Sequence, residues 1–201
     1  MMDTRTHILM VSLRLFLQKS FKEVTMKEIV EKTGMSKGAF YHYFTSKEQL
    51  FHEIIHTFFA AILEFDFNAL PGDSLQHFYR GYADQVNAMR YRFLSAGGTE
   101  EEDFINLNFF ALLFDAFKLF PGFREKMEEY HRKETAAWTA MIRKARENGE
   151  IRSPLSDHQI ALIFMYVSDG LTMNLTMENN TGDLDKSLAS LWDNFYETLK
   201  A

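Results

Sequence analysis

A short stretch of the chain, residues 25–50, carries a dense set of helix-start and helix-stop signals. Thr25 stands three residues before Glu28, which is the spacing of a capping box at the beginning of a helix. Gly34 suits the left-handed residue that ends this helix, and Ser36 is a favourable N-cap for the next one. The segment therefore predicts two short helices joined by a tight glycine turn, which is typical of a helix-turn-helix.

A third helix is expected directly after the second. Thr45 and Ser46 each stand three residues before an acid or amide, Glu48 and Gln49, and this pattern is typical of a helix start. Lys47 then lies at the helix N-terminus beside free backbone N–H groups. We expect a phosphate to be well held at that position.

The second helix has one apolar face and one polar face. Phe40 and Phe44 lie one turn apart and should face the core. Gly38 has no side chain, so DNA could approach the backbone closely there. The polar face offers hydrogen-bond donors and little that could do covalent chemistry, as a helix in the major groove requires. The donors are the side chains of Ser36, Lys37, Tyr41, His42 and Tyr43.

The run G-M-S-K-G-A-F-Y-H-Y-F-T-S-K-E-Q-L resembles the reading head of the TetR family of transcriptional regulators. The similarity covers residues 5–55, about a quarter of the chain, and its glycine, capping serine, Lys-Gly pair and closing Phe follow the family's order. The family usually has His where this chain has Tyr43, and the histidine stands one residue earlier, at His42. Tyrosine can still donate a hydrogen bond to a phosphate, so we expect DNA binding to survive.

The resemblance implies a transcriptional regulator that binds a palindromic operator in double-stranded DNA, and repression is the predicted mode of action. The alternative is a generic helical hairpin with a solvated Lys and Tyr face. We expect base contacts from Lys37, Gly38, Ala39 and His42. We expect phosphate contacts from Thr25, Ser36, Tyr41, Tyr43 and Lys47.

The charge distribution agrees with DNA binding even though the net charge of the chain is −6. Residues 1–50 hold 8 Lys and Arg against 5 Asp and Glu, a net charge of +3. Residues 51–201 hold 14 against 23, a net charge of −9. The basic N-terminal part is therefore the expected footprint on DNA.

The composition indicates a soluble cytoplasmic protein. The chain has no cysteine, which excludes disulfides, thiolate metal sites and cysteine nucleophiles. The apolar run 8–17 is interrupted by Arg14 and fits one helical face, so we interpret it as a packed first helix and not a signal peptide. No stretch approaches the expected length of a membrane span. No cofactor is predicted.

The rest of the chain is predicted to be helical throughout, which makes the protein all-α with about nine helices. We expect a DNA-binding domain at 1–50, with its motif at about 25–44, and a helical ligand-sensing and dimerisation domain at 51–201. The helices expected after residue 45 run over 46–71, 73–94, 99–117, 121–148, 156–178 and 183–199.

The last two helices predict a homodimer. The final helix has a continuous apolar stripe, and the helix before it, around I-A-L-I-F-M-Y-V-S-D-G-L-T-M-N-L, is apolar on nearly every face. The resemblance implies dimerisation through these two helices, and the alternative is that both lie inside the core of a monomer. The stripe residues predicted at the interface are Leu184, Leu188, Leu191, Trp192 and Phe195.

An excess of phenylalanine suggests a pocket in the second domain. The chain has 20 Phe, of which 16 follow residue 50, and the simplest interpretation is an aromatic core. Small lipophilic ligands also bind in pockets lined in this way, and the resemblance implies that such a ligand releases operator DNA. Asp169 is a possible polar anchor, or could bond within the dimer interface. The predicted ligand-binding residues are Phe110, Phe114, Trp138, Met165 and Asp169.

The motif H-E-x-x-H at His52, Glu53 and His56 matches a zinc-protease signature and supports the alternative of a zinc-dependent hydrolase. Against it, the motif lies in the helix that follows the reading head, and no obvious third ligand follows at a typical spacing. We therefore predict no enzyme, no catalytic residue and no metal site, while metal binding by His52 and His56 themselves stays open.

Overall fold

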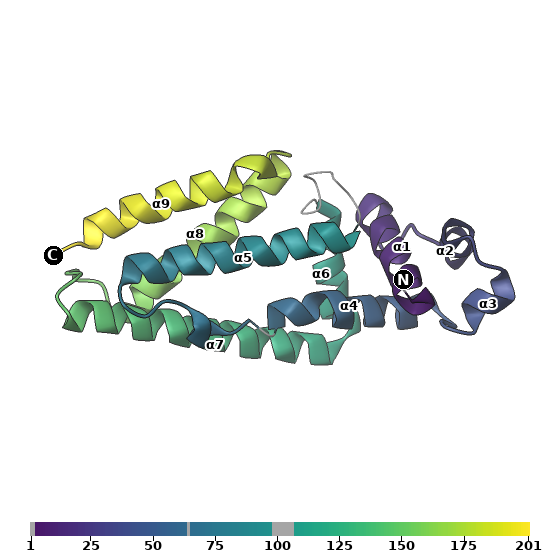
Figure 1. The fold of residues 1–201 in the computed structure, drawn as a ribbon, viewed down its shortest axis with the longest axis horizontal. Coiled ribbons are helices and arrows are strands. Elements are labelled where there is room, and N and C mark those ends of the chain that lie inside the picture. The colour runs from purple at the N-terminus through teal and green to yellow at the C-terminus, as the bar shows by residue number, and fades with distance from the viewer. Residues whose placement is uncertain (1–2, 64, 98–106) are drawn as a thin grey trace. The chain divides into compact units, whose positions relative to one another are not determined.

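The computed structural model of this chain describes residues 3–63, 65–97 and 107–201, and the regular structure of these residues is helical (Figure 1). They contain nine α-helices and two short 3-10 turns, which confirms the all-α prediction. The chain forms two compact units, one of Met1–Glu64 with Arg92–Glu125 and one of Phe65–Tyr91 with Lys126–Ala201. Each unit is made of two separate stretches of the chain. The predicted domain boundary at residue 50 stays a prediction.

The first unit begins with α1 (Thr4–Lys19), α2 (Met26–Thr33) and α3 (Lys37–Tyr41). The predicted packed first helix is confirmed, because α1 lies against α2, α4 and α6. Phe40 and Phe44 are fully buried, also as predicted. The ring of Phe16 makes edge contacts with Phe21 and Phe51, at centroid distances of 5.4 and 5.8 Å. This aromatic cluster holds α1 and the segment after it against α4.

Helix α4 covers Lys47–Leu63, so the prediction that it extends to residue 71 is wrong. The side chain of Asp66 accepts a hydrogen bond from the backbone N–H of Asn68 and caps a 3-10 turn, η1 (Phe67–Ala69). A capping acid of this kind offers the backbone an alternative to a continued helix.

Helices α5 (Leu75–Gly97), α6 (Leu107–Leu119) and α7 (Pro121–Glu147) correct the predicted boundaries slightly. The hydroxyl of Ser74 accepts from the N–H of His77 and starts α5, which extends three residues beyond the predicted end. The predicted helix start at residue 99 lies outside the described residues. Pro121 occupies the first turn of α7, as its fixed φ favours.

Helices α8 (Asp157–Met177) and α9 (Leu184–Leu199) lie side by side, with a 3-10 turn, η2 (Thr181–Asp183), between them (Figure 1). The helix predicted from residue 156 is confirmed, and it starts with a complete capping box of Ser156 and Gln159. The indole Nε1 of Trp192 donates to the carbonyl of Phe164, at 3.0 Å, and ties the two helices together. This pair forms part of an aromatic core in the second unit that also includes Tyr79, Tyr82 and Trp138.

Helix α8 corrects one further expectation. Its 21 residues are long and apolar enough, by length and composition alone, to cross a membrane. The core helix of a soluble protein passes the same test, and Phe164 and Met165 of α8 belong to the core of the second unit.

Candidate DNA-binding interface

The turn between α2 and α3 is built by the residues that the sequence singled out. The hydroxyl of Thr25 accepts from the N–H of Glu28 at 3.2 Å, and Gly34 adopts the left-handed conformation, with φ of 70°. The hydroxyl of Ser36 accepts from the N–H of Ala39 at 3.3 Å. The carboxylate of Glu28 pairs with Lys19 at 2.6 Å, so α2 is joined to α1 at this point.

Helix α3 presents its polar face to solvent and is anchored by the buried ring of Phe40. The side chains predicted to contact bases, at Lys37, Ala39 and His42, are exposed, and so is Gly38. A Cβ added at Gly38 would meet no atom within 4 Å, so the fold itself does not require glycine there. The open space is instead what the close approach of another molecule would need.

Two pairs of side chains extend this surface. The ammonium of Lys37 lies 6.0 Å from the ring centroid of Tyr41, which is half-buried. The ring of His42 meets that of Tyr43 edge to face, at 5.6 Å and 84°. Tyr43 is half-buried as well, and Thr25 and Ser36 are exposed at the two helix starts. The residues predicted to touch DNA are thus brought together around α3, with the exception of Lys47.

The ammonium of Lys47, for which a phosphate contact is predicted, makes hydrogen bonds within the fold. Its ammonium donates to the carbonyls of Phe21 and Val24, at 2.7 and 2.8 Å, and lies 4.5 Å from the ring centroid of Phe21. An ammonium group that donates to two carbonyls stabilises the segment that carries them. These contacts assign Lys47 to holding the segment before α2 against α4, while its phosphate contact stays a prediction.

Arg5 is a positioning residue that the sequence did not reveal. Its guanidinium makes a bidentate ion pair with Glu53 on α4 and lies 5.1 Å from the ring centroid of Phe44, just beyond α3. These two contacts of Arg5 link the start of α1 to α4 and to the residue Phe44 that follows α3. The two partners stand 48 positions apart, and no local pattern announces such a pair.

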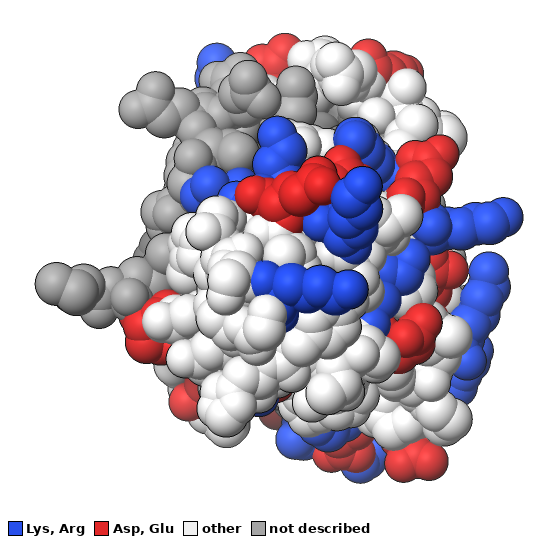
Figure 2. Space-filling view, turned by 90° about the vertical axis from the view of Figure 1, so that its right-hand side faces the viewer, with Lys and Arg blue, Asp and Glu red and all other residues white. Residues whose placement is uncertain are grey.

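The face shown in Figure 2 carries charged side chains of both signs. Lys and Arg side chains are spread over the face shown, acidic side chains lie between some of them, and a broad uncharged area lies beside them. Such a surface can follow a phosphate backbone while leaving uncharged groups to meet bases.

The ion pair of Arg5 and Glu53 involves the glutamate of the H-E-x-x-H motif. The carboxylate of Glu53 is held by Arg5 and is therefore not placed as a general base. The rings of His52 and His56 lie close together, with centroids 4.8 Å apart. Among the described residues no group of three or more metal-ligating side chains includes them.

The predicted ligand-binding residues are divided between the two units. Phe110 and Phe114 lie on α6 in the first unit, where Phe114 is exposed and lines a hollow of about 410 Å³ with Phe117, Lys118 and Arg124. Trp138 and Met165 are buried in the core of the second unit, as the alternative interpretation of an aromatic core expected. Asp169 is exposed on α8.

A buried carboxylate that the sequence did not single out lies in the second unit. Glu134 on α7 accepts a hydrogen bond of 2.5 Å from the hydroxyl of Tyr82 on α5. Burial raises the pKa of Glu134 to about 7, and the nearby carboxylate of Asp169 adds to the rise. Although Asp169 as a whole residue is exposed, its carboxyl is partly desolvated, and this raises its pKa. One turn away, the Nε1 of Trp138 is buried without a hydrogen-bond partner among the residues that the structure covers.

The predicted dimer residues lie on both faces of α9. Leu184, Leu188 and Trp192 are already buried inside the single chain, and their place at a dimer interface stays a prediction. Phe195 is half-buried and packs on Phe164, with ring centroids 5.1 Å apart. Leu191 is 46% exposed. It is the member of the predicted stripe that remains available to a partner.

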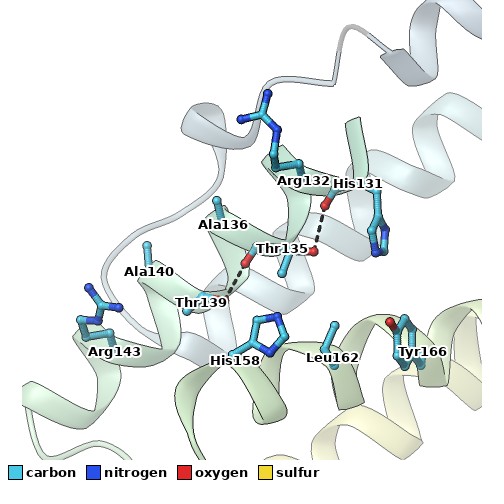
Figure 3. A pocket seen from close by; sticks show the side chains of 10 residues that line it. All are labelled: His131, Arg132, Thr135, Ala136, Thr139, Ala140, Arg143, His158, Leu162 and Tyr166. Carbon is cyan, nitrogen blue, oxygen red and sulfur yellow. Dashed lines mark hydrogen bonds between the residues drawn. The ribbon is translucent and has the colours of Figure 1, made fainter. Parts of the chain in front are cut away.

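A groove of about 600 Å³ lies between α7 and α8 (Figure 3). Its α7 wall includes the small side chains of Ala136 and Ala140, and its α8 wall includes Leu162 and Tyr166. Tyr166 is 55% exposed. Aromatic side chains such as that of Tyr166 are enriched at protein–protein interfaces.

Comparison with known proteins agrees with this geometry. Residues 8–54 match the family described as bacterial regulatory proteins, tetR family. The chain is 41% identical over 76 residues to the transcriptional regulator AcrR of Shigella flexneri, covering 36% of this chain and 35% of that protein. It is 25% identical over 181 residues to the regulator YfiR of Bacillus subtilis strain 168, covering 85% and 78%.

A third relative is the transcriptional repressor NemR of Escherichia coli K12, which is 37% identical over 59 residues, 29% of this chain and 30% of NemR. The matched parts of AcrR and NemR are thus about a third of each protein. The crystal structure of reduced E. coli NemR aligns with 99% of this chain and 98% of its own, with a TM-score of 0.57 and 22% identity. That likeness shows a shared fold over the whole chain.

Proposed function

Because this chain belongs to the TetR family of transcriptional regulators, we propose that it is a DNA-binding regulator in the cytoplasm which acts as a repressor. It binds a palindromic operator as a homodimer and is released by a small lipophilic ligand. The observation that carries the proposal is the exposed α3, whose backbone is open to close approach at Gly38. The similarity to NemR, a transcriptional repressor, supports repression.

In this proposal α3 enters the major groove. Lys37, Ala39 and His42 face base edges, and Gly38 lets the helix backbone lie close to the DNA. Around this centre, Thr25, Ser36, Tyr41 and Tyr43 donate hydrogen bonds to phosphates, which fixes the register of the helix. Two heads related by a two-fold axis would read half-sites roughly 34–36 Å apart.

The ligand acts on the helical part of the chain. Glu134 and the unpartnered indole of Trp138 are polar groups in an aromatic environment, and such groups commonly orient a bound molecule. In the second unit, Asp169 is a predicted contact that a ligand could reach from solvent. Phe114 lies in the first unit, at a hollow of its own.

Selection of bound sequences from random double-stranded DNA with the purified protein tests the proposal. The expected result is an enriched palindrome whose half-sites are separated by one helical turn. His42→Ala should change the enriched bases, whereas Ser36→Ala should weaken binding to all sequences. Recovery of no enriched sequence, or of an unpaired single site, would contradict operator recognition by a homodimer.

A further inference from the structure

We propose that His52 and His56 form a chelating site for a divalent transition-metal ion on α4, which nothing in the DNA-binding proposal requires. The two residues stand four positions apart on one helix, so their side chains share a face. Both are exposed, so an ion can reach them from solvent. Imidazole suits copper, nickel and zinc and is a poor ligand for magnesium.

The distance between the rings fits a shared ion. A metal–nitrogen bond of about 2.0–2.1 Å places a metal about 3.2 Å from the centre of an imidazole ring. Two rings that bind one ion at an angle of about 90–110° then have centroids about 4.5–5.2 Å apart. The centroids of His52 and His56 are 4.8 Å apart, with 49° between the ring planes.

The surroundings restrict His52 before any ion binds. Its ring meets the ring of Phe120 edge to face, at 4.9 Å and 83°, and Phe120 is itself packed at 5.6 Å from the buried Phe51. A ligand whose orientation is already limited loses less freedom on binding. His52 is therefore supported by the aromatic core of the first unit.

The rest of the motif indicates binding without hydrolysis. Arg5 holds the carboxylate of Glu53, and within the described residues no third His, Asp or Glu completes the site. The remaining coordination positions are left to water. Because both ligands lie on successive turns of α4, a bound ion would cross-link these turns and stabilise the helix.

Titration of tag-free protein with Cu²⁺, Zn²⁺ and Mg²⁺, followed by calorimetry, tests the site. The expected result is one ion bound per chain, with Cu²⁺ tighter than Zn²⁺ and no binding of Mg²⁺. His52→Gln and His56→Gln should each weaken binding by at least about tenfold. His77→Gln should leave it unchanged; this imidazole faces Asp73 four residues before it and is the matched control.

A relocation variant separates chelation from the mere presence of two imidazoles. Combining His56→Gln with Thr57→His keeps both imidazoles but places them five positions apart, on different sides of the helix. It should bind as weakly as His56→Gln alone. Equal affinity of the relocation variant and the wild type, or no loss in either single variant, would overturn the proposal.

A second readout keeps the test valid if a variant is less stable. Zn²⁺ should raise the melting temperature of the wild type, and a chelator should reverse the rise. The same addition should leave the melting temperature of His56→Gln unchanged. Since metal and protons compete for imidazole, the rise should shrink as the pH is lowered. A rise of equal size in both proteins would place the ion elsewhere and refute the site.

Discussion

Gly38 separates what α3 needs for folding from what it needs for binding. A Cβ at this position meets nothing within 4 Å, and alanine favours a helix over glycine by roughly 0.5–1 kcal/mol. Gly38→Ala should therefore be at least as stable as the wild type in urea unfolding. It should weaken operator binding about tenfold, because the methyl group holds the helix away from the DNA.

The control for this change is Gly122→Ala. Gly122 lies in the first turn of α7, and a Cβ added there also meets nothing within 4 Å. It should gain similar stability and bind the operator as the wild type does, in a titration followed by fluorescence anisotropy. Unchanged binding in Gly38→Ala would mean that α3 does not approach DNA through this residue.

Lys47 and Lys37 both belong to the proposed DNA-binding part of the chain, but their surroundings differ. Lys47 donates to two carbonyls and covers the ring of Phe21, so Lys47→Ala should cost about 1–3 kcal/mol of unfolding free energy. Lys37 is exposed, and Lys37→Ala should change stability by less than about 0.5 kcal/mol while weakening DNA binding. Urea unfolding of both variants provides the comparison.

The salt dependence of binding tests this assignment independently. If Lys47 contacts a phosphate after all, Lys47→Ala would fold as stably as the wild type and lower the salt slope of operator binding by about one unit. The structure predicts instead that Lys47→Ala lowers the free energy of unfolding and leaves the salt slope of operator binding unchanged.

Local signals predicted the elements well, because capping and turn residues act on neighbours in the sequence. Thr25, Gly34 and Ser36 occupy the positions expected of them. The long-range pairs could not be predicted in this way. Arg5 meets Glu53, and Lys47 meets carbonyls 23 and 26 positions earlier, only because α1, α2 and α4 pack together.

The helical stripe of α9 shows the same limit at the scale of an element. Its apolar spacing correctly predicted a helix with one buried face. Periodicity does not say whether a stripe is covered by the same chain or by a partner. The structure covers Leu188 and Trp192 with α5, α7 and α8 of the same unit, and leaves Leu191 outside.

Two helices of the second unit, α5 and α7, are joined by a pair that should respond to pH. Burial raises the pKa of the Glu134 carboxyl from 4.5 to about 7, so the folded state holds this proton more tightly than the unfolded chain does. Its contribution is fully favourable below pH 4.5 and is lost as the pH rises to about 7. The loss amounts to about 3 kcal/mol.

Glu134→Gln removes this titration and can still accept the hydrogen bond from Tyr82. In urea unfolding it should gain stability over the wild type as the pH rises from about 5 to about 8. Glu128→Gln, an exposed acid on the same helix, should follow the wild type across that range. Parallel curves for Glu134→Gln and the wild type would show that the carboxyl titrates normally.

At the scale of the whole molecule, the proposed homodimer predicts a surface that is exposed in one chain and apolar. In the second unit the large apolar side chains with the greatest exposure lie on α8 and α9, at Tyr166, Met177 and Leu191. Tyr166 lines the groove whose α7 wall includes the small side chains of Ala136 and Ala140 (Figure 3). The groove could take a side chain of the partner. We propose this surface, together with Leu191 of the predicted stripe, as the interface of the homodimer.

Leu191→Asp should therefore produce a folded monomer. A charge at a buried interface is costly when no partner neutralises it, whereas in the single chain Leu191 already meets water. Sedimentation should show the loss of the dimer, and circular dichroism should show unchanged helix content. Binding to the full palindrome should fall at least about a hundredfold, because the two heads then bind as separate molecules.

Leu119→Asp is the matched control, since Leu119 on α6 is 45% exposed and Leu191 is 46% exposed. It should remain dimeric and bind the palindrome. Leu188→Asp, which is 6% exposed, should instead unfold the chain, as a charge placed in its core requires. If Leu191→Asp stays dimeric while Leu119→Asp dissociates, the partner meets α6, and the proposed pairing of α8 and α9 must be abandoned.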